Sequence, residues 1–303
     1  MTAIEDSGDR FHRLRSLLYV PADRERFVAG AAGRGADAVI LDLEDGVAEA
    51  NKAAARAALA AAVPQAGQAG ARVFVRVNSR LAHAALDVEA AVRAGADGLF
   101  VPKTDDAQWL RLIAERAGEV EREAGRPDGW TRLVPMIESL RGLDRRAEIA
   151  AATPRNLALV CGGEDLSAEL GADPAAEVMR LAKLQILMTA KAAGLAAFGL
   201  MGSLAGIDDL DALRHAAEEA QAQGFDGASC IHPAQVPVVT RAFTPDDAAV
   251  DHARRVVAAL LPGRGTAKVD GRMIDAPVVA RARRVLARAG VAATGPDGRP
   301  DDD

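Results

Sequence analysis

The stretch GADAVILD (35–42) recurs in altered form as GADGLFVP (95–102) and as GFDGASCI (224–231). Each copy opens with a glycine, which can adopt the left-handed backbone conformation that ends a helix, and the aspartate two residues later can cap the loop before a strand. The apolar run that follows is typical of a strand with both faces buried. The repeat indicates that one helix–loop–strand unit is used several times in this chain.

Apolar runs of this kind occur eight times, and alanine-rich amphipathic stretches such as 51–63, 105–124 and 174–193 separate them. Eight strand–helix units in succession predict an α/β fold with parallel strands. They favour a (β/α)8 TIM barrel over an open doubly wound sheet. The predicted strands lie within residues 15–21, 38–45, 71–78, 98–103, 131–139, 157–165, 196–203 and 227–233.

The eight units do not use the whole chain. We expect a barrel catalytic domain at 14–243 and a C-terminal helical extension or lid at 244–290. The extension has two helical patterns around a short segment, KVDGRMIDAP (268–277). The polar stretches at 1–13 and 291–303 are expected to be flexible tails.

The composition of the chain argues against several classes of function and location. The net charge is −6, with acidic and basic residues mixed along the chain, which argues against a nucleic-acid or membrane surface. No run of about 18 consecutive apolar residues occurs, and the polar N-terminus lacks the apolar core of a signal peptide. Two cysteines, Cys161 and Cys230, form no disulfide framework, so we expect a reducing, cytoplasmic location.

Polar side chains close most of the predicted strands, at the barrel end where active sites lie. Glu138 and Asp165 close the fifth and sixth runs, so we expect them on neighbouring strands roughly 5 Å apart. Two carboxylates this close need a shared proton or a cation, and Mg²⁺ suits two acids with open positions for substrate and water. The alternative is that each acid forms its own ion pair with an arginine such as Arg141.

Arg76 lies among valines in VFVRVN (73–78), in a strand that we expect to be buried. A buried guanidinium needs an anion, and its planar fork suits a substrate carboxylate or an enolate-like oxygen. The alternative is a structural ion pair with Asp42, Glu44 or Asp45 on the neighbouring strand. Both roles are compatible if the acids orient the arginine.

Two other patterns are compatible with covalent catalysis. Lys103 could act as a Schiff-base lysine, although a metal site nearby would make this unnecessary. Cys230 and His232 alternate on the last predicted strand, so a nucleophile–base pair competes there with a packed cysteine and a hydrogen-bonded histidine.

Seven stretches, from about Arg15 to Ala289, together resemble the citrate lyase beta-chain family of CoA-ester lyases, within the HpcH/HpaI aldolase superfamily. They are RSLLYVPADRERFVAGAAGRGADAVILDLEDGV (15–47), VFVRVN (73–78), LFVPK (99–103), VPMIES (134–139), GGEDLSAELG (162–171), CIHPAQVPVVTRAFTP (230–245) and DGRMIDAP (270–277).

The resemblance implies a Mg²⁺-dependent barrel enzyme, with Mn²⁺ as an alternative metal, that forms a homo-oligomer such as a trimer or hexamer. It implies a carbon–carbon lyase that cleaves or forms the bond between a 2-oxo acid and an acyl-CoA, as malyl-, citramalyl- and citryl-CoA lyases do. A thioesterase acting on the same CoA esters and a CoA-independent 2-oxo acid aldolase are the alternatives.

Carried over by motif, the resemblance assigns the metal to Glu138 and Asp165. It assigns a catalytic and substrate-binding role to Arg76 and a catalytic role to Glu44, which belongs to the acid cluster of LDLED. It also implies that an acid of the C-terminal extension, Asp275, acts in the active site of a neighbouring subunit.

Further substrate contacts are expected from Glu138, Asp45 and Arg15. A local basic cluster could bind the CoA diphosphate despite the negative total charge. This cluster consists of Arg13, Arg15, Arg24 and Arg26.

Overall fold

The computed structural model describes residues 11, 13–203, 207–260 and 265–291, and every one of the eight predicted runs contains a strand. The strands are β1 (Ser16–Pro21), β2 (Ala38–Asp42), β3 (Arg72–Arg76), β4 (Gly98–Val101), β5 (Arg132–Ile137), β6 (Ala158–Cys161), β7 (Ala196–Phe198) and β8 (Ala228–Cys230).

These strands form one parallel sheet in the order β7-β6-β5-β4-β3-β2-β1-β8. The two edges meet at a parallel bridge between Phe198 and Gly227, and the Gly199 N–H donates to the Gly227 carbonyl at 2.9 Å. The sheet therefore closes, and the predicted (β/α)8 barrel is confirmed.

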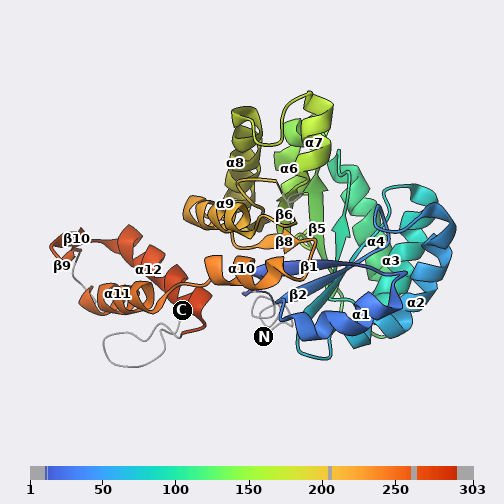
Figure 1. The fold of residues 1–303 in the computed structure, drawn as a ribbon, viewed down its shortest axis with the longest axis horizontal. Coiled ribbons are helices and arrows are strands. Elements are labelled where there is room, and N and C mark those ends of the chain that lie inside the picture. The colour runs from blue at the N-terminus through green and yellow to red at the C-terminus, as the bar shows by residue number, and fades with distance from the viewer. Residues whose placement is uncertain (1–10, 12, 204–206, 261–264, 292–303) are drawn as a thin grey trace. The chain divides into compact units, whose positions relative to one another are not determined.

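Helices cover the outside of the barrel. Figure 1 shows α1 to α4, from blue to teal, side by side along β1 to β4, and each of these helices packs on the next. The helices of the barrel are α1 (Glu25–Ala31), α2 (Lys52–Ala66), α3 (Leu81–Ala94), α4 (Ala107–Glu123), α5 (Leu140–Asp144), α6 (Arg146–Ala150), α7 (Gly163–Leu170), α8 (Glu177–Ala192), α9 (Leu210–Gln223) and α10 (Gln235–Ala242).

Strand side chains alternate between the barrel interior and the layer under the helices. Inside, the ring centroids of Phe74 and Phe100 lie 5.6 Å apart, and those of Tyr19 and Phe100 lie 6.2 Å apart. Leu18, next to Tyr19, packs instead into the large apolar cluster between strands and helices. Because the side-chain period of a strand is two, Arg76 faces the interior with Phe74.

The repeated turn agrees with the prediction in its glycine but not in its aspartate. Its glycine has a positive φ in all three copies, 72°, 91° and 110° at Gly35, Gly95 and Gly224. Its aspartate does not cap its own loop but accepts a backbone N–H from the adjoining strand, which ties the starts of neighbouring strands together. The pairs are Arg15 N–H to Asp37, Val73 N–H to Asp97 and Ala197 N–H to Asp226.

Contacts divide the chain into two compact units, Leu14–Phe243 and the residues from Thr244 onward together with the N-terminal segment. In the second unit, α11 (Asp247–Ala259) packs on α12 (Ala276–Ala289), which confirms the two helical patterns. Between them, β9 (Ala267–Val269) and β10 (Arg272–Ile274) form an antiparallel hairpin that was not predicted. Its function as a lid stays a prediction.

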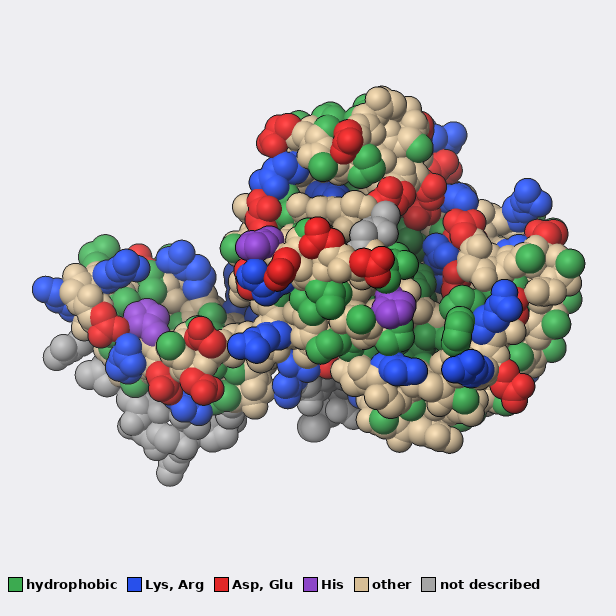
Figure 2. Space-filling model, in the orientation of Figure 1, with side chains coloured by type: hydrophobic (Ala, Val, Ile, Leu, Met, Phe, Trp, Pro, Cys, Tyr) green, Lys and Arg blue, Asp and Glu red, His purple; other side chains and the backbone are tan. Residues whose placement is uncertain are grey.

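The described surface carries both signs of charge. Figure 2 shows Lys and Arg interspersed with Asp and Glu over the face in view, as the composition predicted. None of the described helices has the length and apolar character needed to cross a membrane. Most of the two predicted tails, residues 1–10 and 292–303, lies outside the described residues.

Candidate active site

Arg76 is the centre of a buried ionic cluster at the carboxyl end of the strands. Its Nε and Nη2 donate to Asp42 Oδ1 and Oδ2, at 2.7 and 2.6 Å, and its Nη1 lies 3.2 Å from Glu44 Oε2. Burial opposes the positive charge, but Asp42 outweighs burial and raises the pKa of Arg76. The ring of Tyr19 lies against the guanidinium, with its centroid 5.0 Å from Cζ. The ion pair considered as an alternative for Arg76 is therefore present, and it orients the arginine.

Asp42 also shapes the loop after β2. Its Oδ1 and Oδ2 accept the backbone N–H groups of Glu44 and Gly46, both at 2.9 Å. A Cβ atom at Gly46 would lie 2.4 Å from Asp42 Oδ2, so only glycine lets the loop close around the carboxylate. From the other side, buried Lys52 donates to the carbonyls of Leu43 and Glu44, at 2.9 and 2.8 Å. Asp42 and Lys52 thus both fix the backbone that carries Glu44.

Glu44 lies between two cations. It is 4% exposed, and its Oε1 is 3.3 Å from Lys103 Nζ while the other oxygen faces Arg76. Neither carboxylate oxygen receives a well-aligned hydrogen bond from a described residue. Burial raises the pKa of Glu44, as expected of a group that exchanges a proton. The predicted substrate contact Asp45 is exposed at the rim, 3.9 Å from Lys103 Nζ.

The surroundings of Lys103 do not suit a Schiff base, which needs an amine with a lowered pKa. Burial lowers the pKa of Lys103, but Glu44 and Asp45 outweigh burial and raise it overall. The backbone of Lys103 has a φ of 49°, a strained value for a side chain of this size. This conformation brings its N–H to Glu138 Oε2, at 2.6 Å. Lys103 therefore positions Glu138.

Glu138 directly follows β5 and is 6% exposed. Burial raises the pKa of Glu138 to about 7; the Lys103 N–H opposes this rise, and the charges of Glu44 and Asp165 add to it. An added Cβ at Gly162 would lie 2.3 Å from Glu138 Cγ and 2.4 Å from its Oε1. The first glycine of the GGED motif therefore makes room for the buried carboxylate.

The prediction that Asp165 closes the sixth strand is wrong. β6 ends at Cys161, and Asp165 lies in the first turn of α7 rather than at a strand end. Successive residues of a helix point about 100° apart, so Glu164 and Asp165 point in different directions. Asp165 is exposed, and its charge acts on Glu138. The two predicted metal ligands are thus near each other, but they come from a strand end and a helix start.

The arginine alternative for these two acids is not found. Arg141 pairs with Asp106, at 3.5 Å, and no ion pair joins Glu138 or Asp165 to a described residue. The described residues also hold no converging group of three Asp, Glu, His or Cys side chains. Two carboxylates that form no ion pair with a described residue could hold a divalent cation and leave its other positions to water and substrate.

The predicted basic cluster is divided between the two ends of the barrel. Arg15 precedes β1 and forms a bidentate ion pair with Asp37, both contacts at 2.8 Å. Arg24 and Arg26 follow β1, and both are exposed. A six-residue strand separates the two groups, which is about 20 Å at roughly 3.3 Å per residue. Arg15 is therefore at the opposite end from Arg76, and the structure does not support its predicted substrate contact.

Asp275 lies in the C-terminal unit as the N-cap of α12, where its Oδ1 accepts the Val278 N–H at 3.2 Å. Its catalytic role stays a prediction.

Cys230 is fully buried, and burial raises the pKa of its thiol to about 12. The Nδ1 atom of His232 accepts the Ala234 N–H at 3.2 Å. These two side chains agree with the packed cysteine and hydrogen-bonded histidine.

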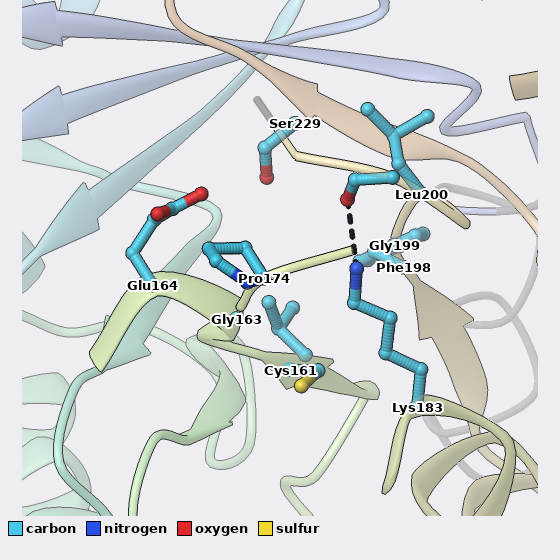
Figure 3. Close-up of a pocket in the computed structure, with 11 residues that line it drawn as sticks. Cys161, Gly163, Glu164, Pro174, Lys183, Phe198, Gly199, Leu200 and Ser229 are labelled. Atoms are coloured by element: carbon cyan, nitrogen blue, oxygen red, sulfur yellow. Dashed lines mark hydrogen bonds between the residues drawn. The ribbon is translucent and has the colours of Figure 1, made fainter. Parts of the chain in front are cut away.

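A cavity opens beside β6, β7 and β8, at the same end of the barrel (Figure 3). Lys183 of α8 reaches it, and its Nζ donates to the Gly202 carbonyl at 2.7 Å, the dashed line in Figure 3. Lys183 was not predicted from the sequence, although a signal was present. The lysine falls on the apolar stripe of its helix, beside buried Met179, Ala182 and Ile186, and a lysine is seldom buried unless its charge has a partner.

Comparison with known proteins identifies the family. Residues 15–233, nearly the whole barrel, match the family described as HpcH/HpaI aldolase/citrate lyase. The chain belongs to this HpcH/HpaI family. The citrate lyase subunit beta of Escherichia coli is 38% identical over 282 residues, which cover 91% of this chain and 93% of that protein. A (3S)-malyl-CoA thioesterase of Cereibacter sphaeroides is 34% identical over 285 residues, which cover 92% and 95%.

A solved structure agrees with this membership. CitE from Mycobacterium tuberculosis, in complex with magnesium, acetoacetate and coenzyme A, has a TM-score of 0.73 and 36% identity, covering 93% of this chain and 99% of that one. The predicted family resemblance is thereby confirmed. So is the enzyme class, because members of the HpcH/HpaI family are carbon–carbon lyases.

The contact between Gly162 and Glu138 can be tested by Gly162→Ala. The new methyl group must displace the Glu138 carboxylate, which also breaks its hydrogen bond from Lys103. We expect a loss of about 1–3 kcal/mol in the free energy of unfolding, measured by denaturant titration. Gly163→Ala is the matched control, because its Cβ would meet only the Lys183 side chain, with Cε at 3.5 Å and Nζ at 3.8 Å. Equal stability of the two variants would contradict the close packing of Glu138.

Proposed function

We propose that this protein is a Mg²⁺-dependent CoA-ester lyase that cleaves or forms the C–C bond between a 2-oxo acid and an acyl-CoA. One observation carries the proposal: the acid-oriented Arg76 lies at the same end of the barrel as Glu138 and Asp165, which form no ion pair with a described residue, in a member of the HpcH/HpaI family. The magnesium and coenzyme A bound to CitE support the same ligands for this chain.

Glu138 and Asp165 are the proposed metal ligands. A divalent cation between them would supply Lewis acidity toward the oxygens of the 2-oxo acid and offset the repulsion between the two carboxylates. Burial keeps Glu138 from ordinary solvation, and Lys103 and Gly162 fix its position. The chain thus supplies a rigid ligand and a more exposed one.

Arg76 is the proposed stabiliser of the negative charge that develops on the thioester oxygen. Asp42 occupies one edge of the guanidinium, so the direction of the remaining N–H groups is set before substrate binds. Such preorganised charge is a large contribution in reactions that pass through an enolate. In the synthetic direction the methyl carbon of the acyl group adds to the oxo carbon, and its proton ends on the new alcohol.

Two acids are candidates for moving that proton. Glu44 is in contact with Arg76, and burial raises its pKa. Asp275 would come from a neighbouring copy of the chain, which requires the homo-oligomer that we also propose. Exposed apolar side chains at Val178, Leu181 and Met188, spaced along one face of α8, favour such an assembly.

A thioesterase acting on the same esters is the second candidate, favoured by the relative from Cereibacter sphaeroides. The deciding experiment incubates the whole protein with Mg²⁺ and a CoA ester of malate, citramalate or citrate, and separates the products by chromatography. We expect acetyl-CoA together with a 2-oxo acid. Free CoA together with the intact hydroxy acid would replace the lyase by the thioesterase.

Magnesium binding should depend on pH, because the pKa of Glu138 is raised to about 7. This value lies above that of a free glutamate, about 4.3, so the metal-free fold loses stability as pH rises toward 7, and Mg²⁺ restores it. At pH 6 the metal must displace a proton. The Mg²⁺ concentration that gives half of the shift in melting temperature should be about tenfold higher at pH 6 than at pH 8.

The controls for this titration are Glu138→Gln and Asp165→Asn. Both should lose the magnesium-dependent shift and the turnover while remaining folded. Full activity of the unsubstituted protein in EDTA would rule out the metal site.

Arg76→Lys keeps a charge beside Asp42 but loses the planar fork. We expect kcat to fall by about 10²–10³-fold, with the magnesium titration unchanged.

Asp275→Asn should also slow turnover but leave stability unaltered, because asparagine caps a helix as well as aspartate does. If sites are shared, a re-assembled mixture of the Arg76 and Asp275 variants regains part of the activity. Normal kinetics of both single variants would assign the two residues to structure alone.

A further inference from the structure

Tyr19 and Arg76 meet in the interior of the barrel. They come from β1 and β3, and Met136, which contacts the Tyr19 hydroxyl, comes from β5. The interior of a (β/α)8 barrel is filled in layers whose side chains come from alternate strands. Tyr19, Arg76 and Met136 follow this rule, and the contacts that join them place them in one layer. Arg76 therefore has an aromatic ring as a neighbour within its own layer.

Two contacts fix the Tyr19 ring. The ring meets Phe100 edge-on, with the centroids 6.2 Å apart and the ring planes at 70°, which is a favourable arrangement of two aromatic rings. The Tyr19 hydroxyl donates to Met136 Sδ at 3.8 Å, and a thioether sulfur is only a weak acceptor. The ring is thus oriented before any ligand binds, mainly through its apolar contacts.

The hydroxyl group of Tyr19 is not suited to proton transfer. Burial raises the pKa of Tyr19; Arg76 opposes this rise, and the charges of Asp42 and Glu138 add to it. The phenol therefore keeps its proton, and its hydrogen bond goes to a sulfur rather than to one of the acids of the site. The ring is the part of Tyr19 that can act on Arg76.

Asp42 holds only one edge of the Arg76 guanidinium. Its two oxygens accept Nε–H and Nη2–H, at 2.7 and 2.6 Å. A planar group held along one edge can still tilt about that edge. Glu44 lies 3.2 Å from Nη1, but its oxygens receive no well-aligned hydrogen bond from a described residue, so it does not fix the tilt. The ring of Tyr19, whose centroid is 5.0 Å from Cζ, covers one face of the guanidinium and limits the tilt.

A ring suits this task better than a further acid would. The face of an aromatic ring attracts a guanidinium, and the attraction is strongest where water is excluded. The Arg76 side chain is 14% exposed, so most of it is shielded from solvent. Another carboxylate would use N–H donors that the ring leaves free. Tyr19 can therefore hold Arg76 without competing with a ligand for its N–H groups.

We propose that Tyr19 is a positioning residue for Arg76. Its ring face sets the plane of the guanidinium, and the plane sets the direction of the N–H groups that Asp42 leaves free. The expected effect on turnover rests on the proposed function, in which these N–H groups stabilise the thioester oxygen. The effect on the orientation of Arg76 does not depend on the reaction.

The first arm of the test measures lyase turnover in Mg²⁺ with a CoA ester of malate, citramalate or citrate. Tyr19→Phe keeps the ring face, and its kcat should stay close to that of the unsubstituted protein. Tyr19→Leu removes the ring, and we expect kcat to fall about 5- to 30-fold while KM changes by less than about threefold. Tyr19→Met, which fills more of the same space, replaces Tyr19→Leu if the leucine variant does not fold.

Phe74→Leu is the matched control for a lost interior ring. Phe74 is fully buried two residues before Arg76 on β3, and its ring packs on Phe100. Denaturant titration should show that Phe74→Leu and Tyr19→Leu both lose stability. Only Tyr19→Leu should lower kcat, because only Tyr19 covers the guanidinium.

The second arm needs no turnover. Crystal structures of Tyr19→Phe and Tyr19→Leu show the guanidinium of Arg76 directly. We expect both variants to keep the two hydrogen bonds between Arg76 and Asp42. The plane of the guanidinium should be unchanged in Tyr19→Phe, and it should tilt or take several positions in Tyr19→Leu. If the CoA ester is only hydrolysed, the lyase proposal fails, and these structures still decide the role of Tyr19.

Three results would overturn the inference. One is a guanidinium plane that Tyr19→Leu leaves unchanged. Another is an equal loss of kcat in Tyr19→Phe and Tyr19→Leu, which would assign the effect to the hydroxyl. The third is an equal loss of kcat in Phe74→Leu, which would assign it to packing of the barrel interior in general.

Discussion

The ion pair between Asp42 and Arg76 is the contact on which the rest of the site depends. The parallel register places the two residues side by side at the ends of β2 and β3, and the interior of the barrel removes both from water. An arginine largely buried there needs an anion, and Asp42 supplies it through two hydrogen bonds. The same carboxylate accepts the N–H groups of Glu44 and Gly46. One buried acid therefore orients the arginine and folds the loop that carries its second partner.

Much of the site could be predicted from the positions where the apolar runs end. The errors of prediction also arise at the ends of these runs. Apolar runs identified all eight strands because strands buried on both faces have a continuous apolar sequence. Arg76 and Glu138 were predictable because they end or directly follow such runs. Arg15 was misplaced although its position before β1 already put it at the opposite end. Asp165 was assigned to a strand because its motif, GGED, continues an apolar run, but the strand ends at Cys161 and a helix begins at Gly163.

Other features depend on contacts of the folded chain and cannot be recognised in the sequence. Gly46 and Gly162 are explained only by side chains, Asp42 and Glu138, that fold against them from elsewhere. Lys52 looks like a surface lysine until its helix is packed. Asp270 and Gly271 are a different case, since Asp-Gly between short alternating stretches is a strong hairpin signal. Both residues have positive φ, and the hairpin could have been predicted.

We propose that Glu138 and Asp165 together hold a metal beside Arg76. Crystals of the whole chain grown with Mn²⁺ and oxaloacetate test it directly, through the anomalous scattering of manganese. The expected result is one anomalous peak between the Glu138 and Asp165 carboxylates, with the oxo acid bound to it. A peak at other side chains, or ordered oxo acid bound away from these two acids, would contradict the account.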